Sequence, residues 1–134
     1  MRVREAIVRE FVQQWLTQAE NDFGAAQLML SEGKYLSLVG FHSQQAAEKF
    51  LKAFLVEHQI EFPKTHEIRD LLSLVAQVDR RLAESLRSAS ALSPYGVDIR
   101  YPGDLPELSL EQAKTAVELA ALVREQVHRA LRGD

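Results

Sequence analysis

Polar side chains recur along one side of the segment between Tyr35 and His58. With a helical step of about 100° per residue, four of them gather within about a quarter turn: His42, Gln45, Lys49 and Lys52. Lysine carries a point charge suited to phosphate, and a glutamine side chain both donates and accepts hydrogen bonds. The stripe is therefore either a solvated helix face or a donor-rich surface that meets a partner helix or an anionic ligand.

Arg100 and Tyr101 are the second candidate for binding, in a Pro- and Gly-rich segment over residues 93–108. The arginine fork pairs with phosphate and the tyrosine ring can stack, so the two suit a planar or phosphorylated ligand. The alternative is structural. Arg100 would then pair with Asp98 or Glu48 and hold the loop to the bundle, while Tyr101 packs on the core.

The other chemical groups favour structural roles. Glu48 is spaced to pair with Lys52, four residues on. His66 is expected to pack at a helix start or to bond a neighbouring loop, and Arg124 and His128 are interpreted as surface residues. The sequence has no carboxylate–histidine cluster with ligand spacing, no phosphate-binding glycine loop and no nucleophile elbow. We therefore predict no catalytic residue, no metal site and no cofactor.

Helical periodicity runs through the whole chain. Apolar residues at three-and-four spacing predict a first helix of about six turns over residues 8–30, stopped by Gly33. A second helix is expected from about Tyr35 to His58, with an apolar face formed by Leu36, Val39, Ala47, Phe50, Leu51 and Phe54. Further helices are predicted after the caps Thr65 and Asp79, and after a capping box of Ser109 with Gln112.

Composition indicates one globular domain. The chain has 134 residues, 46% of them apolar, and a net charge of -3, which argues against broad electrostatic binding of nucleic acid. The absence of cysteine excludes disulfides and thiolate zinc sites and fits a reducing cytoplasm, and no apolar run approaches the ~20 residues of a membrane span. We predict an all-α fold, an up-and-down bundle of about five helices resembling a four-helix bundle, with a long loop before the last helix.

Several motifs together resemble the HEPN domain family. The run Phe41-His-Ser-Gln-Gln-Ala-Ala-Glu-Lys-Phe-Leu-Lys-Ala53 resembles its second-helix signature. Trp15, Ala19 and Asp22 on the first helix fit the same family, as do the segments 63–68 and Arg100-Tyr-Pro102. The resemblance covers about residues 10–131, so the whole chain, 1–134, is taken as one HEPN-like domain.

The resemblance implies a helical bundle that usually dimerises, and two classes of activity. Some HEPN members are RNA-cleaving toxins that use an arginine followed, after four to six residues, by a histidine. Others are helical partners of a small nucleotidyltransferase and help bind nucleotide or substrate. Here Arg100 has no histidine in that range, and Arg124 and His128 are separated by only three residues.

The leading hypothesis is therefore a cytoplasmic, homodimeric binding subunit of a separate small nucleotidyltransferase, in a toxin–antitoxin-like pair. Its ligand groove would be lined by His42, Gln45, Lys49, Arg100 and Tyr101. Two alternatives stay open: a metal-independent RNase toxin, disfavoured by the missing histidine, and a dimeric structural adaptor without a small ligand.

Overall fold

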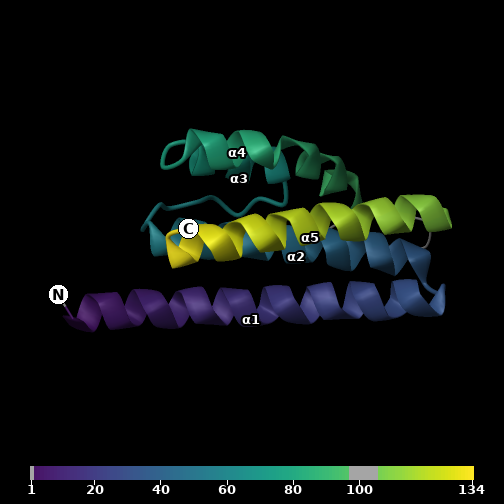
Figure 1. Ribbon diagram of the computed structural model, residues 1–134, viewed down its shortest axis with the longest axis horizontal. Coiled ribbons are helices and arrows are strands. Elements are labelled where there is room, and N and C mark those ends of the chain that lie inside the picture. The colour runs from purple at the N-terminus through teal and green to yellow at the C-terminus, as the bar shows by residue number, and fades with distance from the viewer. Residues whose placement is uncertain (1, 97–105) are drawn as a thin grey trace.

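The computed structural model describes residues 2–96 and 106–134 and is helical throughout this part, without a strand. Its elements follow in the order α1 (Arg2–Glu32), α2 (Leu36–Glu57), α3 (Ile68–Val75), α4 (Arg80–Ser85), the 3₁₀ helix η1 (Arg87–Tyr95) and α5 (Leu110–Arg132). The predicted all-α bundle is confirmed (Figure 1).

The helices lie in layers around α2. Figure 1 shows α1 along one side of α2 and α5, with α3 and α4 on the opposite side. The α3–η1 segment carries the chain back toward the end at which α2 begins, so α5 runs in the same direction as α2 and both run opposite to α1. Because α2 packs against α1, α3, η1 and α5, it is the central helix of the molecule.

The predicted apolar face of α2 forms the centre of the core. All its members are buried except Leu36, which is half-buried: Val39, Ala47, Phe50, Leu51 and Phe54. Burial extends around the helix, however, and includes the polar residues Ser43, Gln44, Glu48 and Lys52. A helix that is covered on nearly all sides cannot be divided into one core face and one solvated face.

The helix α1 is longer than predicted, and its first turns reach past the end of α2 (Figure 1). Ala19, Phe23 and Ala26 are buried against the bundle as the spacing predicts. Phe11 shares that periodicity but lies exposed, whereas the adjacent Val12 is buried. Gly33 ends the helix with a positive φ of 66°, a conformation that glycine adopts without strain.

Two of the predicted helix starts are confirmed, and one is displaced. Asp79 accepts a hydrogen bond from the Leu82 N–H, and Ser109 forms the expected capping box. The Thr65 prediction was wrong by two residues, because α3 begins at Ile68 and has Glu67 at its N-cap. The Thr65 hydroxyl instead accepts a hydrogen bond from the Glu67 N–H and orders the turn before the helix.

The segment after Asp79 forms two short helices rather than one. Leu82, Leu86 and Ala89 are buried as predicted, but the chain passes from α4 into the 3₁₀ helix η1. Serine hydroxyls donate to carbonyl groups three residues back, from Ser85 to Leu82 and from Ser90 to Arg87. No helix in the described residues is both long and apolar enough to cross a membrane.

Candidate functional site

His42 and Lys49 from the polar stripe both contact Asp22 on α1. The Lys49 Nζ donates to one Asp22 carboxylate oxygen at 2.6 Å, and the His42 Nδ1 donates to the other at 2.8 Å. The Asp22 side chain is only 14% exposed. Burial acts to raise the Asp22 pKa, but the hydrogen bonds from His42 and Lys49 outweigh it and hold the pKa below its ordinary value.

These contacts decide one alternative that the sequence left open. Two members of the stripe, His42 and Lys49, meet α1 as a partner helix and bind Asp22 there, so this part of the stripe is not a solvated face. Lys49 has three N–H donors and Asp22 takes one of them, so a ligand can still contact the ammonium group. That His42, Gln45 and Lys49 bind a ligand stays a prediction.

Gln45 belongs to a second polar group, centred on Glu48. Its Nε2 donates to the Gln44 Oε1 at 2.8 Å, and the Gln44 Nε2 donates to Glu48 and to the His66 carbonyl. Glu48 also accepts from the Lys52 Nζ at 2.9 Å and from the His66 Nδ1 at 2.8 Å. The predicted pairing of Glu48 with Lys52 is confirmed, whereas the His66 side chain bonds to helix α2, a contact that the sequence analysis did not predict.

Glu48 is an ionised group in the interior. Its side chain is 4% exposed and that of Lys52 is 9% exposed. Burial raises the Glu48 pKa, while hydrogen bonds from Lys52, Gln44 and His66 lower it by more, so that the pKa lies below its ordinary value. The group therefore remains a carboxylate at neutral pH and ties α2 to the linker that precedes α3.

Arg124 and His128 are partly exposed at the surface, as interpreted from the sequence, but both also bind a carboxylate on another helix. The Arg124 Nε donates to Glu20 on α1 at 2.8 Å, and the His128 Nε2 donates to the same carboxylate at 2.7 Å. Desolvation raises the Glu20 pKa, but these hydrogen bonds outweigh it and leave it lowered. The pair joins α5 to α1 across more than 100 residues of sequence, which no local spacing reveals.

Arg100 and Tyr101 lie outside the described residues, as does Asp98. The described residues on either side of that segment both contact the first half of α2. A Cβ placed on Gly96 would meet the side-chain carbon of Gln44 at 2.3 Å, and one placed on Gly40 would meet the Leu108 Cδ2 at 2.9 Å. The segment therefore leaves and rejoins the described structure beside α2.

A part of the site that the sequence analysis missed lies at the end of the polar stripe. Trp15 on α1 and Phe62 in the linker approach edge to face, with ring centroids 6.2 Å apart. The Lys52 Nζ lies 5.5 Å from the centroid of each ring. Trp15 and the 63–66 segment were noted for their family resemblance, but only the fold shows that they meet at Lys52.

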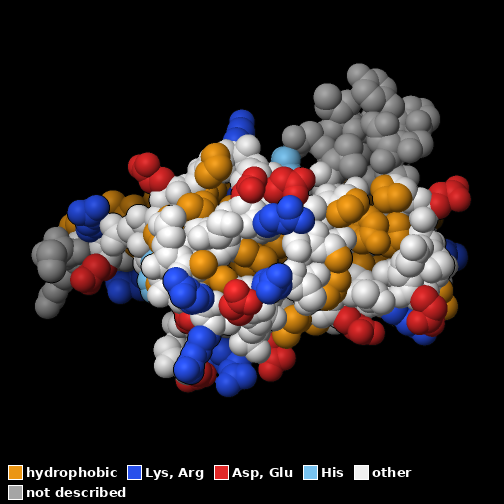
Figure 2. All heavy atoms as spheres, turned by 90° about the horizontal axis from the view of Figure 1, so that it is seen from above, with side chains coloured by type: hydrophobic (Ala, Val, Ile, Leu, Met, Phe, Trp, Pro, Cys, Tyr) orange, Lys and Arg blue, Asp and Glu red, His pale blue; other side chains and the backbone are white. Residues whose placement is uncertain are grey.

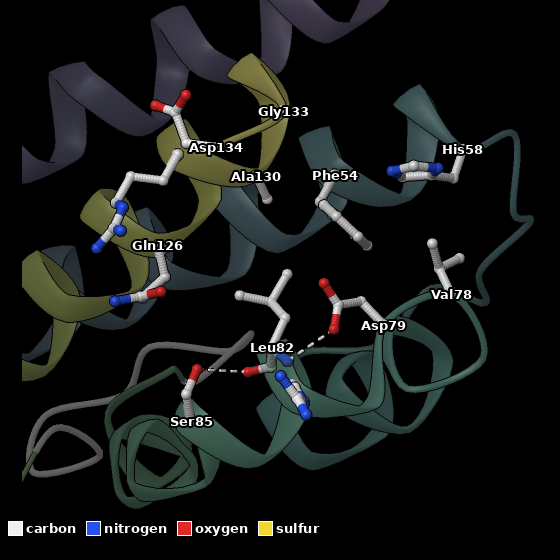
Figure 3. A pocket seen from close by; sticks show the side chains of 12 residues that line it. Phe54, His58, Val78, Asp79, Leu82, Ser85, Gln126, Ala130, Gly133 and Asp134 are labelled. Atoms are coloured by element: carbon white, nitrogen blue, oxygen red, sulfur yellow. Dashed lines mark hydrogen bonds between the residues drawn. The ribbon is translucent and has the colours of Figure 1, made fainter.

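A hollow of about 540 Å³ lies between the C-terminal ends of α2 and α5 and the start of α4 (Figure 3). Of the predicted binding residues that the structure describes, His42, Gln45 and Lys49, none lines it. Figure 3 shows that Asp79 and Ser85 are already hydrogen-bonded to the Leu82 backbone there. In the described part of the chain, no group of three or more histidine or carboxylate side chains could hold a metal ion.

The charged surface agrees with the modest net charge. Figure 2 shows acidic and basic side chains interleaved over the face viewed from the side of α3 and α4, with apolar patches between them. Such a mixed surface lacks the broad positive field that non-specific nucleic-acid binding uses.

Comparison with known proteins agrees with this arrangement. A model of the HEPN domain matches residues 12–130. The fold is similar to the crystal structure of TT1696 from Thermus thermophilus, with 28% sequence identity and a TM-score of 0.69 over 88% of this chain and 96% of that one. No curated protein matches the chain significantly. Since the family model spans most of the sequence, the chain belongs to the HEPN domain family.

Proposed function

We propose that this protein is a cytoplasmic helical binding subunit that works with a separate small nucleotidyltransferase. The subunit supplies binding groups for nucleotide or substrate, and its partner carries the transfer chemistry. The binding groups are His42, Gln45 and Lys49 on α2 together with Arg100 and Tyr101. Membership of the HEPN family supports the general role, and the sequence supplies no nucleotidyltransferase motif of its own.

The observation that carries this proposal is that described residues on both sides of the 97–105 segment contact α2. Gly96 lies against Gln44, and Leu108 lies against Gly40. Gln45 donates to Gln44 on this side of α2, while Lys49 lies one turn further along the helix. The chain on both sides of Arg100 and Tyr101 therefore packs against the first half of α2, which carries His42 and Gln45.

Electrostatics limits how strongly this face can bind an anion. Asp22 cancels most of the positive charge of Lys49, so a phosphate must share that ammonium with a carboxylate. We therefore expect modest, salt-sensitive affinity from the subunit alone and stronger binding when a partner adds contacts.

Calorimetric titration of ATP into the subunit, alone and with the partner, tests the proposal. Arg100→Ala is expected to weaken binding about fivefold or more, because it removes a charge-assisted contact. Arg69→Ala is the matched control, since Arg69 is exposed on α3 away from this face. Absence of ATP binding both by the subunit and by the complex would contradict the proposed ligand role.

A homodimer is also proposed, and the overhanging end of α1 is its proposed interface. Val3, Ile7 and Phe11 follow one another at four-residue spacing and are exposed. Apolar residues in such a row are typical of a helix that packs on a second helix. Because they remain exposed in the part of the chain that the structure describes, a second copy is the partner that would bury them symmetrically.

A further inference from the structure

An open hollow of about 630 Å³ lies between α1, α2 and the linker that joins α2 to α3. Its volume falls within the range of small-molecule sites. It is lined by aromatic and basic side chains together with one proline: Trp15, Lys52, Phe62, Pro63, Lys64 and His66. That combination is not expected of a surface that only closes a hydrophobic core.

The aromatic rings offer surface on which a flat group can pack. Trp15 and Phe62 are half-buried, and their rings meet edge to face with an interplanar angle of 67°. Their contact with each other therefore leaves part of each ring open to the hollow. Stacking on such rings is how proteins bind nucleobases without reading their sequence.

The charge at the floor of the hollow is nearly balanced. Lys52 is buried and donates to Glu48, so the two charges cancel. Its ammonium also lies 5.5 Å from both ring centroids, within the range of cation–π attraction. An anionic ligand would gain from the remaining N–H donors of this ammonium.

The rim carries one exposed lysine, Lys64, that forms no ion pair within the described residues. Lys64 is exposed and makes no hydrogen bond or ion pair with any side chain in residues 2–96 or 106–134. It therefore gives the hollow a net attraction for anions. An aliphatic carboxylate would use Lys64 but not the rings, so the full lining fits a flat aromatic group that bears an anion.

We propose that this hollow binds the nucleobase and phosphate of a nucleotide. The base packs on Trp15 and Phe62, and the phosphate is bound by Lys64 with Lys52 beneath it. The choice of a nucleotide rests on the proposed function, and Lys52 continues the same polar stripe of α2 by one turn beyond Lys49. The same chemistry occurs in a free mononucleotide and at the 5′-phosphorylated end of a nucleic-acid strand.

Trp15 is the only tryptophan of the chain, so its fluorescence reports on this hollow alone. The full chain is titrated with AMP, with adenosine, with ribose 5-phosphate and with a 5′-phosphorylated oligoadenylate, in parallel with calorimetry. Excitation at the red edge of the indole band avoids absorption by the base. We expect a saturable change in Trp15 fluorescence with AMP. Adenosine and ribose 5-phosphate, which each lack one half of AMP, should bind at least about tenfold more weakly. The oligoadenylate should bind more tightly than AMP only if a strand end is the natural ligand.

Lys64→Ala is expected to weaken AMP binding about fivefold, and Phe62→Leu about tenfold. Lys34→Ala is the matched control, because Lys34 is an equally exposed lysine at the other end of α2. Lys64 is exposed, so its variant keeps the fold, which circular dichroism verifies. The Lys64 result therefore stands even if Phe62→Leu loosens the linker.

Two results would overturn the inference. In the first, calorimetry detects AMP binding, but Trp15 fluorescence does not change and Lys64→Ala binds AMP with unaltered affinity. That result would place the nucleotide at another site and would leave the proposed function intact. The other is an absence of AMP and oligoadenylate binding to a subunit that still joins its nucleotidyltransferase. If the subunit joins no nucleotidyltransferase but AMP still changes the Trp15 fluorescence, the proposed function is wrong and the hollow remains a nucleotide site.

Discussion

At the scale of single residues, three carboxylates organise the polar side of the bundle. Asp22, Glu20 and Glu48 each accept from one histidine and from one lysine or arginine. Asp22 and Glu20 lie on α1 and bind α2 and α5, while Glu48 binds the linker before α3. Each carboxylate thus connects elements that local sequence patterns treat separately.

The Asp22 contact gives a direct prediction of stability. Replacing Asp22 with asparagine leaves Lys49 and His42 half-buried without their charged partner, so the free energy of unfolding should fall by about 1–2 kcal/mol. Urea denaturation measures this change. Glu10→Gln is the control, since Glu10 is an exposed carboxylate on the same helix and should alter stability by less than about 0.5 kcal/mol. Equal effects of the two changes would show that Asp22 does not join the helices.

The lowered pKa values of Asp22 and Glu48 predict sensitivity to acid. Their stabilisation is complete above the ordinary values of 3.8 and 4.5 and is lost as the pH falls through the lower values in the folded state. The free energy of unfolding should therefore decrease as the pH drops below about 4.5. Glu48→Gln should cost about 2 kcal/mol at neutral pH and flatten this decrease. Urea titrations at several pH values test both, and an unchanged acid slope in Glu48→Gln would contradict the assignment.

At the scale of elements, the closest approach is that of α2 to η1 and to the residues before α5. A Cβ on Gly40 would lie 2.9 Å from the Leu108 Cδ2 and 3.1 Å from the Tyr95 Cγ. In contrast, a Cβ on Gly24 of α1 would meet nothing within 4 Å. Close packing therefore leaves no room for a side chain at Gly40, whereas there is room for one at Gly24.

Replacing each glycine with alanine tests this difference in packing. Gly24→Ala should stabilise the protein by about 0.5–1 kcal/mol, because alanine is the better helix former. Gly40→Ala gains the same helix preference but must displace Leu108 and Tyr95, so we expect a net loss of about 1 kcal/mol. Thermal unfolding should show melting temperatures that move in opposite directions. Stabilisation by both changes would mean that α2 is not closely packed at Gly40.

Features that depend on residues close together in the sequence could be predicted, and features that depend on distant residues could not. The starts at Asp79 and Ser109 and the stop at Gly33 were predicted because capping involves neighbours in sequence. The contact of Lys52 with the Trp15 and Phe62 rings could not be predicted, because those residues are distant in sequence. The contact of Arg124 with Glu20 could not be predicted either, because the two lie on different helices. The sequence identified His42 and Lys49 as a pair on one face, but not that Asp22 binds both.

At the scale of the whole molecule, α2 is enclosed by the other helices and α1 extends beyond them. The enclosed helix carries the polar stripe, and the extended end of α1 carries exposed Val3, Ile7 and Phe11. The arrangement separates a proposed ligand face from a proposed dimer face, so the two can be disrupted independently.

The dimer face predicts a change in mass. Phe11→Asp places a charge in the proposed interface at a position that is 51% exposed, so it should convert a dimer into a folded monomer. Sedimentation equilibrium at micromolar concentration measures the mass. Leu28→Asp, an exposed leucine near the other end of α1, is the matched control and should leave the dimer intact. A wild-type protein that is monomeric under these conditions would remove the proposal.

The most direct test of the proposed role is the mass of the subunit after coexpression with a small nucleotidyltransferase from the same genome. Native mass spectrometry of the purified material should show one complex that contains both chains and survives dilution to micromolar concentration. If every candidate nucleotidyltransferase separates completely from the subunit, this protein is not the binding partner proposed here.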